Sequence, residues 1–159
     1  MKQQLKRIAA LVFFLSFFAL LIVGYLFRNR LNSHISTMMQ NQITTTETDQ
    51  ISKQLNERFN YDENNQAFEL SFLEFGAKGC LMCRKMEQVM KDIENQHPEV
   101  NVVFVSILKP ENQNFVKYYG ISFIPTQILL DKNGKEFFRN EGYMATEDLI
   151  QELFHKSAR

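Results

Sequence analysis

The sequence predicts an α/β fold, a central mixed β-sheet flanked by helices, preceded by a single N-terminal transmembrane helix. Three observations predict this class. Residues 8–27 form an almost continuous apolar run without a charge. From residue 68 onward, β-like apolar segments alternate with segments of helical periodicity. Asn133 and Gly134 lie between two β-like segments, and this dipeptide is the strongest short hairpin signal in a sequence.

The apolar run from Ile8 to Phe27 is long enough to cross a bilayer. At about 1.5 Å per residue it spans roughly 30 Å, which is the thickness of a hydrocarbon core. The alternative is a cleaved signal peptide, whose apolar region usually has about 7–15 residues and ends at a small-x-small cleavage site. The residues from Gly24 to Arg30 offer no such site. We therefore predict an uncleaved signal-anchor helix that attaches the protein to the membrane through residues 8–27.

The charges around this run set its expected orientation. Three basic side chains lie within residues 1–7, and Arg28 and Arg30 follow the run. Positive-inside counting places residues 1–7 in the cytoplasm and the rest of the chain outside. The chain has no N-x-S/T sequon and is rich in Asn and Lys, which fits a bacterial source. We expect a single-pass protein of the bacterial inner membrane whose domain faces the periplasm or extracytoplasmic side.

Residues 28–64 have a polar composition, rich in Asn, Gln, Thr, Ser and Glu, which predicts a tether. Within it, apolar side chains recur at Ile51, Leu55 and Phe59. This spacing predicts a short amphipathic helix over 49–59 that packs on the following domain. The domain itself is expected to occupy residues 65–159. With 18 basic and 18 acidic side chains the chain has no net charge, and nothing indicates a nucleic-acid partner.

The domain is expected to have the order β-α-β-α-β-β-α, with helices on both faces of its sheet. The helix after the cysteines carries an apolar stripe of Met82, Met86, Val89, Met90 and Ile93, which we interpret as core packing. The expected elements are strands at 68–75, 100–108, 121–131 and 136–139, a helix after residue 80, a short helix at 110–119 and a last helix that opens at 146.

Cys80 and Cys83 are the only cysteines of the chain, and they lie at the start of a predicted helix. Residues three apart on a helix lie on one face, roughly 5–6 Å apart, which a disulfide tolerates. The pair can therefore close and open a bond without moving the backbone far. A thiol at a helix N-terminus is more readily ionised, and the thiolate is the form that attacks disulfides. The spacing predicts a redox-active dithiol.

Other uses of two cysteines do not fit. Structural zinc needs four ligands, but there is no second CxxC and the histidines show no ligand spacing. Covalent haem needs CxxCH, whereas Arg84 follows Cys83, and iron–sulfur clusters need four thiolates as a rule. We expect no metal and no cofactor. A purely structural disulfide is the other alternative, but closing a four-residue loop constrains the unfolded chain very little.

Residues 65–156 resemble the thioredoxin-fold family. The resemblance depends on several motifs in the right order, beginning with a strand that ends at 73–75 and the CxxC at a helix start. Ile124-Pro125-Thr126 follows some forty residues later, then a Lys-Asn-Gly hairpin at 132–134, Gly142 and the final helix. A lone CxxC would be weak evidence, whereas this combination is specific.

The resemblance implies a role for each matching residue. Cys80 would be the exposed nucleophile and Cys83 the buried resolving thiol, and the two would form the disulfide Cys80–Cys83. Glu74, six residues before Cys80, matches the buried acid that shuttles a proton for the second cysteine. Pro125 would be a cis-proline that, with Ile124 and Thr126, holds a client segment beside the dithiol.

The chain also departs from the family pattern. Gly79 and Gly76 stand where aromatic residues are common. Between the cysteines lie Leu81 and Met82, which match neither the reducing thioredoxins nor the well-known periplasmic oxidant. The lysine that usually pairs with the buried acid is Ser106 here. These differences leave the reduction potential and the choice of partner open.

Together these features predict a membrane-anchored thiol–disulfide oxidoreductase that exchanges disulfides with protein clients through a mixed disulfide. It would also need a redox partner to restore its dithiol. The alternative function is a redox-inert thioredoxin-like module that docks a membrane or periplasmic partner through the Pro125 face. Whether it serves as reductant, oxidant or isomerase, and its oligomeric state, stay open from the sequence.

Overall fold

The structure is a computed structural model that describes residues 2–156. The chain divides into two compact units, one up to Ile35 and one from Ser36 onward. The first unit is a single helical segment, part of α1 (Lys2–Gln40). Within the described residues, no single helix meets the length and hydropathy criteria of a membrane span. Leu11–Phe27 and Arg30–Gln40, bent by 51°, meet them as a pair by length and composition.

The second unit is built on a four-stranded sheet in the order β2-β1-β3-β4. β1 (Leu70–Gly76) lies between β2 (Val100–Ser106), which is parallel to it, and β3 (Thr126–Leu130), which is antiparallel. β4 (Glu136–Glu141) pairs with β3 as a hairpin. The mixed sheet predicted from the sequence is thus present, and its two central strands are the most completely buried elements.

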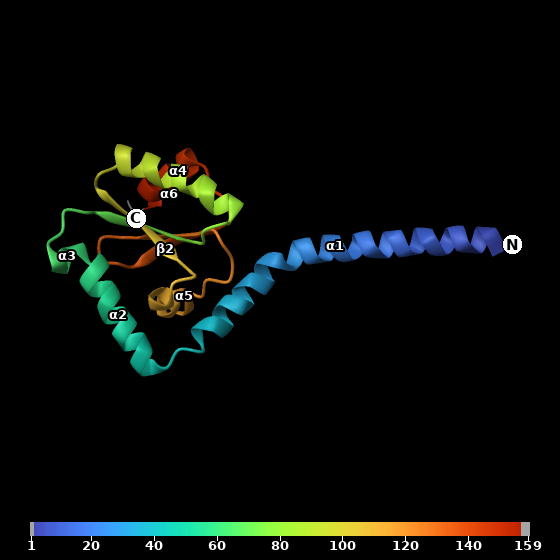
Figure 1. Ribbon diagram of the computed structural model, residues 1–159, viewed down its shortest axis with the longest axis horizontal. Helices are drawn as coiled ribbons and strands as arrows, with labels where there is room; N and C mark the ends of the chain where they lie inside the picture. The colour runs from blue at the N-terminus through green and yellow to red at the C-terminus, as the bar shows by residue number, and fades with distance from the viewer. Residues whose placement is uncertain (1, 157–159) are drawn as a thin grey trace. The chain divides into compact units, whose positions relative to one another are not determined.

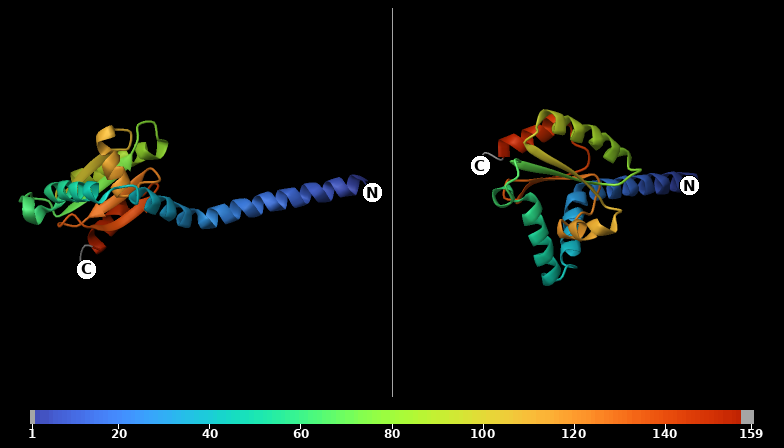
Figure 2. Two further views of the ribbon diagram at one scale, coloured as in Figure 1. Left: turned by 90° about the horizontal axis from the view of Figure 1, so that it is seen from below. Right: turned by 60° about the vertical axis from the view of Figure 1, so that its left-hand side comes forward.

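Helices cover both faces of this sheet. α4 (Leu81–Gln96) and α6 (Thr146–Lys156) lie on one face, while α2 (Thr45–Phe59) and α5 (Gln113–Tyr118) lie on the other (Figures 1 and 2). The remaining short elements are α3 (Tyr61–Asn64) and the 3-10 turn η1 (Pro110–Asn112). From β1 onward the order of strands and α-helices is the predicted β-α-β-α-β-β-α.

The alternation of side chains along the strands divides the core into two clusters. Leu73 and Phe75 point to the face of α2 and α5, whereas Phe72 points to the face of α4 and α6. On the α4 face Phe72 packs with Met86 of α4 and Leu149 of α6, each fully buried. Because its period is two, β1 places Glu74 and Gly76 on the same face as Phe72, toward α4.

The segment predicted as a polar tether, 28–64, is mostly helical. α1 continues to Gln40, and α2 begins four residues before the helix predicted over 49–59. Thr44 starts α2 with a capping box: its side chain accepts from the Glu47 N–H, and the Glu47 carboxylate accepts from the Thr44 N–H. The stripe of Ile51, Leu55 and Phe59 is buried as predicted. The helix predicted over 49–59 is thus confirmed, while the polar composition concealed the continuation of α1 to Gln40 and the first residues of α2.

Other boundaries also differ from the prediction. The strand expected at 121–131 is confined to Thr126–Leu130, since residues 121–125 form the loop that carries Pro125. Met82, assigned to the core stripe, is 40% exposed, while Met86, Val89 and Ile93 are buried. Helical periodicity located the buried face of α4, but in its first turn Cys83 is buried and Met82 is exposed.

Candidate active site

The two cysteines lie at the N-terminus of α4 and form a disulfide, with their Cα atoms 5.2 Å apart. Cys80 is the N-cap residue, and its Sγ accepts a hydrogen bond of 3.2 Å from the backbone N–H of Cys83. Cys80 is partly exposed, whereas Cys83 is only 2% exposed. In the reduced protein, this N–H and the helix dipole would favour the thiolate of Cys80. The exposed and the buried sulfur are those that the sequence predicted.

Gly76, the last residue of β1, lies next to the buried sulfur of Cys83. A Cβ built on this glycine would lie 3.4 Å from Sγ of Cys83 and 2.9 Å from Cε2 of Phe104. The backbone of β1 thus comes close to the disulfide, and the ring of Phe104 from β2 lies beside it. The ring of Phe104 from the neighbouring strand thus occupies the space next to the missing side chain at position 76.

The loop before β3 lies against the same end of β1. The peptide bond between Ile124 and Pro125 is cis, as the sequence predicted. Thr126 pairs with Phe75 across the sheet, so Pro125 comes next to Gly76. The Thr126 side chain is buried, and its hydroxyl donates to the Phe123 carbonyl at 2.7 Å. Thr126 therefore holds the shape of the loop, and the residue that reaches solvent is Phe123, which the sequence analysis had not selected.

Glu74 is fully buried two residues before Gly76, on the face of the sheet that carries Cys83. Burial raises its pKa to about 8, although a hydrogen bond from Gln127 opposes the rise. Nε2 of Gln127 donates to Oε2 of Glu74 at 2.9 Å, while Oε1 has no hydrogen-bond partner among the described residues. A carboxyl group in this state can take up or release a proton near neutral pH.

Gln127 and Asn140 are two further site residues that were not predicted from the sequence. Gln127 is fully buried in β3, opposite Glu74 in the register, and Asn140 of β4 lies opposite Gln127. Nδ2 of Asn140 donates to Oε1 of Gln127 at 2.6 Å. A signal was present, because a glutamine at an inward position of the strand Thr-Gln-Ile-Leu-Leu needs a buried polar partner. The register corrects the expectation for Ser106: Phe104 of β2 lies opposite Glu74, whereas Ser106 lies opposite Gly76. The neutral amide of Gln127, on the other neighbouring strand, is the group that contacts the Glu74 carboxyl group.

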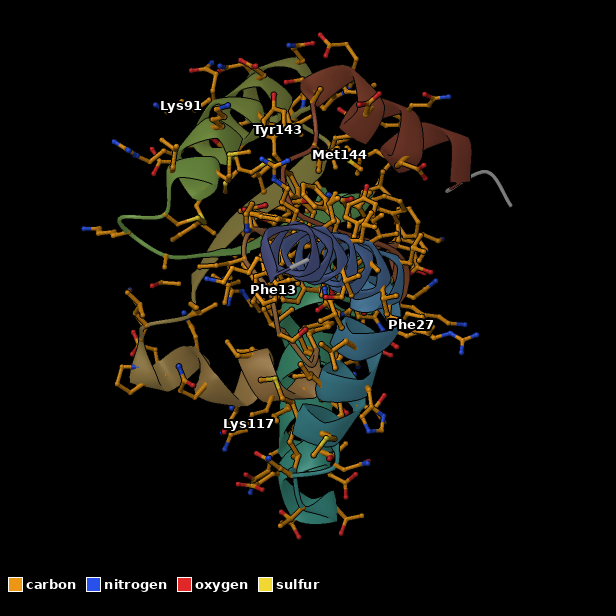
Figure 3. The ribbon with its side chains drawn as sticks, turned by 90° about the vertical axis from the view of Figure 1, so that its right-hand side faces the viewer. Phe13, Phe27, Lys91, Lys117, Tyr143 and Met144 are labelled. Atoms are coloured by element: carbon orange, nitrogen blue, oxygen red, sulfur yellow. A yellow bond between two sulfur atoms is a disulfide. The ribbon has the colours of Figure 1, made fainter. Side chains whose placement is uncertain are left out.

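Four exposed apolar side chains belong to the first turn of α4, to the Pro125 loop or to the segment after β4. Leu81 and Met82 lie between the cysteines, Phe123 lies in the Pro125 loop, and Tyr143 follows β4. Tyr143 lies next to α4 (Figure 3), with Nζ of Lys85 5.8 Å from its ring centre. We call Leu81, Met82, Phe123 and Tyr143 the apolar rim. Large exposed apolar groups around one reactive group are typical of a surface that contacts other proteins.

Comparisons with known proteins agree with this geometry. Residues 60–157 match the model of the family described as "Thioredoxin-like domain", and the chain belongs to this family. A comparison with curated protein sequences gave no match.

Several solved structures are similar in fold. A thioredoxin from Fasciola hepatica has 23% identity and a TM-score of 0.51, with 67% of this chain and 90% of that chain covered. Thioredoxin NaTrxh from Nicotiana alata has 25% identity and a TM-score of 0.51, covering 60% and 80%. A mutant thioredoxin from Halobacterium salinarum has 21% identity and a TM-score of 0.52, covering 60% and 81%. These similarities agree with the fold, and the CxxC pair favours a redox enzyme.

Proposed function

We propose that the protein is a membrane-anchored thiol–disulfide oxidoreductase that exchanges disulfides with protein clients. The observation that carries the proposal is the Cys80–Cys83 pair at the N-terminus of α4, with one sulfur accessible and the other buried on the face of Glu74. A client needs access to only one sulfur, and the second then acts inside the protein. The apolar rim offers this client a contact surface, and the Pro125 loop lies beside it.

The reaction requires two exchange steps. The Cys80 thiolate attacks a client disulfide, forms a mixed disulfide through Sγ, and releases one client sulfur as a thiolate that takes a proton from water. Glu74 then accepts the proton of the Cys83 thiol, and Sγ of Cys83 attacks Sγ of Cys80. The bond to the client breaks, and its second sulfur leaves as a thiolate. The client gains two electrons and the protein ends as the disulfide; the reverse sequence oxidises a client dithiol.

A redox partner of dithiol or disulfide chemistry must then restore the starting state. The direction of net flow depends on the reduction potential of the couple, where about 30 mV corresponds to 1.4 kcal/mol. Equilibration of the Cys80/Cys83 couple with glutathione or dithiothreitol buffers of known potential measures it. A potential near those of thioredoxins would assign a reductant, and a much higher one an oxidant.

Turnover of a protein disulfide tests the proposal. We expect the purified protein, supplied with dithiothreitol, to accelerate reduction of a model disulfide protein, and the Cys80→Ser variant to be inactive. The matched control is Lys53→Ala, which changes an exposed side chain of α2, on the face of the sheet opposite to α4, and leaves both cysteines in place. Absence of turnover in the wild type would contradict the proposal and favour a redox-inert docking module.

The membrane anchor is the second part of the proposal. Its support is the uncharged run of large apolar side chains within Leu11–Phe27, which are exposed along α1. Such a surface is costly in water and stable in a bilayer. Protease added to spheroplasts should digest the second unit without lysis of the inner membrane. Full protection would reverse the orientation, and a mature protein that lacks residues 1–27 would indicate a cleaved signal peptide.

A further inference from the structure

A chain of hydrogen bonds links the Pro125 loop to the buried acid. The N–H of Gly142 donates to the Pro125 carbonyl at 2.7 Å, and the Gly142 carbonyl accepts from Nδ2 of Asn140 at 3.1 Å. Nδ2 of Asn140 also donates to Oε1 of Gln127, whose Nε2 donates to Oε2 of Glu74. The chain therefore runs from the Pro125 loop through residues of β4 and β3 to the carboxyl group of Glu74 in β1.

This chain has a fixed direction. Nδ2 of Asn140 is a donor and can only face acceptors, here the Gly142 carbonyl and Oε1 of Gln127. With its oxygen turned to Asn140, Gln127 must present its N–H₂ group to Glu74. Each amide thus orients the next, and the last donor holds a single oxygen of the carboxyl group. A buried amide with one wrong orientation would leave two polar groups unpaired, so the arrangement is strongly favoured.

The surroundings of Glu74 contain no charge that could replace this amide. On its face of the sheet, α4 contributes Cys83 and Met86, β2 contributes Phe104, and β3 and β4 contribute Gln127 and Asn140. From α6, Leu149 and Leu153 are buried in this core, and Ile150 and Phe154 pack against it. No charged side chain among the described residues shifts the pKa of Glu74. Cys83 lies on the same face of the sheet, with its Sγ 3.4 Å from a Cβ built on Gly76.

We infer that Gln127 and Asn140 are positioning residues for proton transfer: they hold Glu74 by Oε2, leave Oε1 free for the proton of Cys83, and connect this carboxyl group to the Pro125 loop. The inference rests on the proposed exchange function. A cation at this place would keep the carboxylate ionised and weaken it as a base. A neutral donor orients the carboxyl group and still allows it to hold the proton. Because the same chain ends at Pro125, a client segment on that loop would be connected to the acid through Gly142, Asn140 and Gln127.

Two substitutions of Gln127 make opposite predictions. Gln127→Met keeps the length of the side chain but removes the donor, so the pKa of Glu74 should rise. Gln127→Lys places a cation beside the carboxylate, so the pKa should fall. A hydrogen bond to a charged group corresponds to about one to two pKa units, and shifts of this size are expected in each direction. Asn140→Leu, which releases the Gln127 amide, should produce a smaller rise.

Two pH titrations are measured on the wild type and on each of these variants. The first is the infrared band of the protonated Glu74 carboxyl group in the oxidised protein, identified by its loss in Glu74→Gln and titrated with pH. The second is the pH profile of mixed-disulfide resolution, followed by stopped flow after Cys80 has reacted. The control is Ser71→Ala, which removes a buried hydrogen bond of 2.6 Å to Tyr61 on the opposite face of β1. A structural role alone would move stability in all variants and neither pH midpoint.

Opposite shifts of both midpoints in Gln127→Met and Gln127→Lys, absent in Ser71→Ala, support the inference. Midpoints that stay at the wild-type value, or that move alike in both Gln127 variants, overturn it. Failure of the proposed function has a different signature: the wild type then resolves no mixed disulfide at any pH, while the infrared titration still reports whether Gln127 controls the carboxyl group. If variants fold poorly, the infrared titration of the milder Asn140→Leu variant decides between these results.

Discussion

The backbone N–H of Cys83 donates to Sγ of Cys80, and this bond joins the two residues of the disulfide in the first turn of α4. It places the partial positive charge of a backbone N–H group next to the accessible sulfur of Cys80. A thiolate on Cys80 would keep this hydrogen bond and gain from its charge, because bonds to ionised groups are about twice as strong as neutral ones. The asymmetry between the two sulfurs leads to the first prediction.

Cys83→Ser should trap clients on Cys80, whereas Cys80→Ser should trap few or none. The accessible Cys80 can attack a client, but without Cys83 nothing inside the protein resolves the mixed disulfide. Cells that express each variant are quenched with acid and alkylated, and mixed disulfides are counted on non-reducing gels. The reverse pattern would show that Cys83 is the attacking thiol, and the double variant controls for binding without a covalent bond.

Glu74→Gln should remove a pH dependence of stability. Because burial raises the pKa of Glu74 from 4.5 to about 8, the unfolded chain loses this proton near pH 4.5 while the folded protein keeps it until about pH 8. The stability of the wild type should therefore fall as pH rises through this window. One pKa unit corresponds to about 1.4 kcal/mol. The free energy of unfolding of Glu74→Gln, relative to that of the wild type, should therefore increase by several kcal/mol as the pH rises through this window. Urea unfolding of the oxidised proteins measures it; parallel pH profiles would disprove a raised pKa.

The same Glu74→Gln substitution should slow the second exchange step. Glutamine keeps the size of the side chain but cannot accept the proton of Cys83, and general-base catalysis typically contributes about 100-fold or more. The initial attack by Cys80 should keep its rate. Stopped-flow measurement of both steps separates them, and an unchanged second step would leave Glu74 without a catalytic role.

Gly76→Ala should destabilise the domain through Phe104. The new Cβ would lie 2.9 Å from Cε2 of this ring, which is 41% exposed and able to move outward. We expect a loss of about 1 kcal/mol in the free energy of unfolding, at the low end for an overpacked site. The double variant Gly76→Ala/Phe104→Leu should recover most of it in a double-mutant cycle. If no recovery occurs, the contact with Cys83 causes the loss instead.

Gly120→Ala should destabilise the second unit by at least 1 kcal/mol. Gly120 has a φ of +60°, and a Cβ there would come within 2.7 Å of the Ser36 carbonyl oxygen. This contact lies inside the second unit, where Gln40 also donates to the Tyr118 carbonyl at 3.2 Å.

A protein that starts at Ser36 should melt like the full chain, and one that starts at Thr45 should melt lower because Met39 and Ile43 pack against the core. Equal melting temperatures for the two truncations would contradict this assignment.

Much of the fold was predictable because its signals are local. The alternation of β1, the stripe of α4 and the Asn133-Gly134 hairpin each lie within a short stretch of chain, where periodicity and turn chemistry determine the structure. The boundaries of the tether were not predictable in this way. Its helices depend on a cap at Thr44 and on the packing of widely spaced apolar residues against a distant core.

The sequence by itself determined the chemistry of the site. Two cysteines with a two-residue gap at a helix start specify a dithiol, and their order along the helix decides which sulfur is accessible. Position along a helix is a local property, so no distant residue is needed to predict it.

Only the tertiary structure decided how the acid is held. Glu74 and Gln127 are 53 residues apart in the chain, and they meet because the antiparallel register of β1 and β3 places them opposite each other on the α4 face. A shift of this register by one residue would turn Gln127 to the other core and leave Glu74 without its donor. The register between strands that are distant in the chain is fixed only when the whole sheet forms. A local sequence pattern therefore does not predict it.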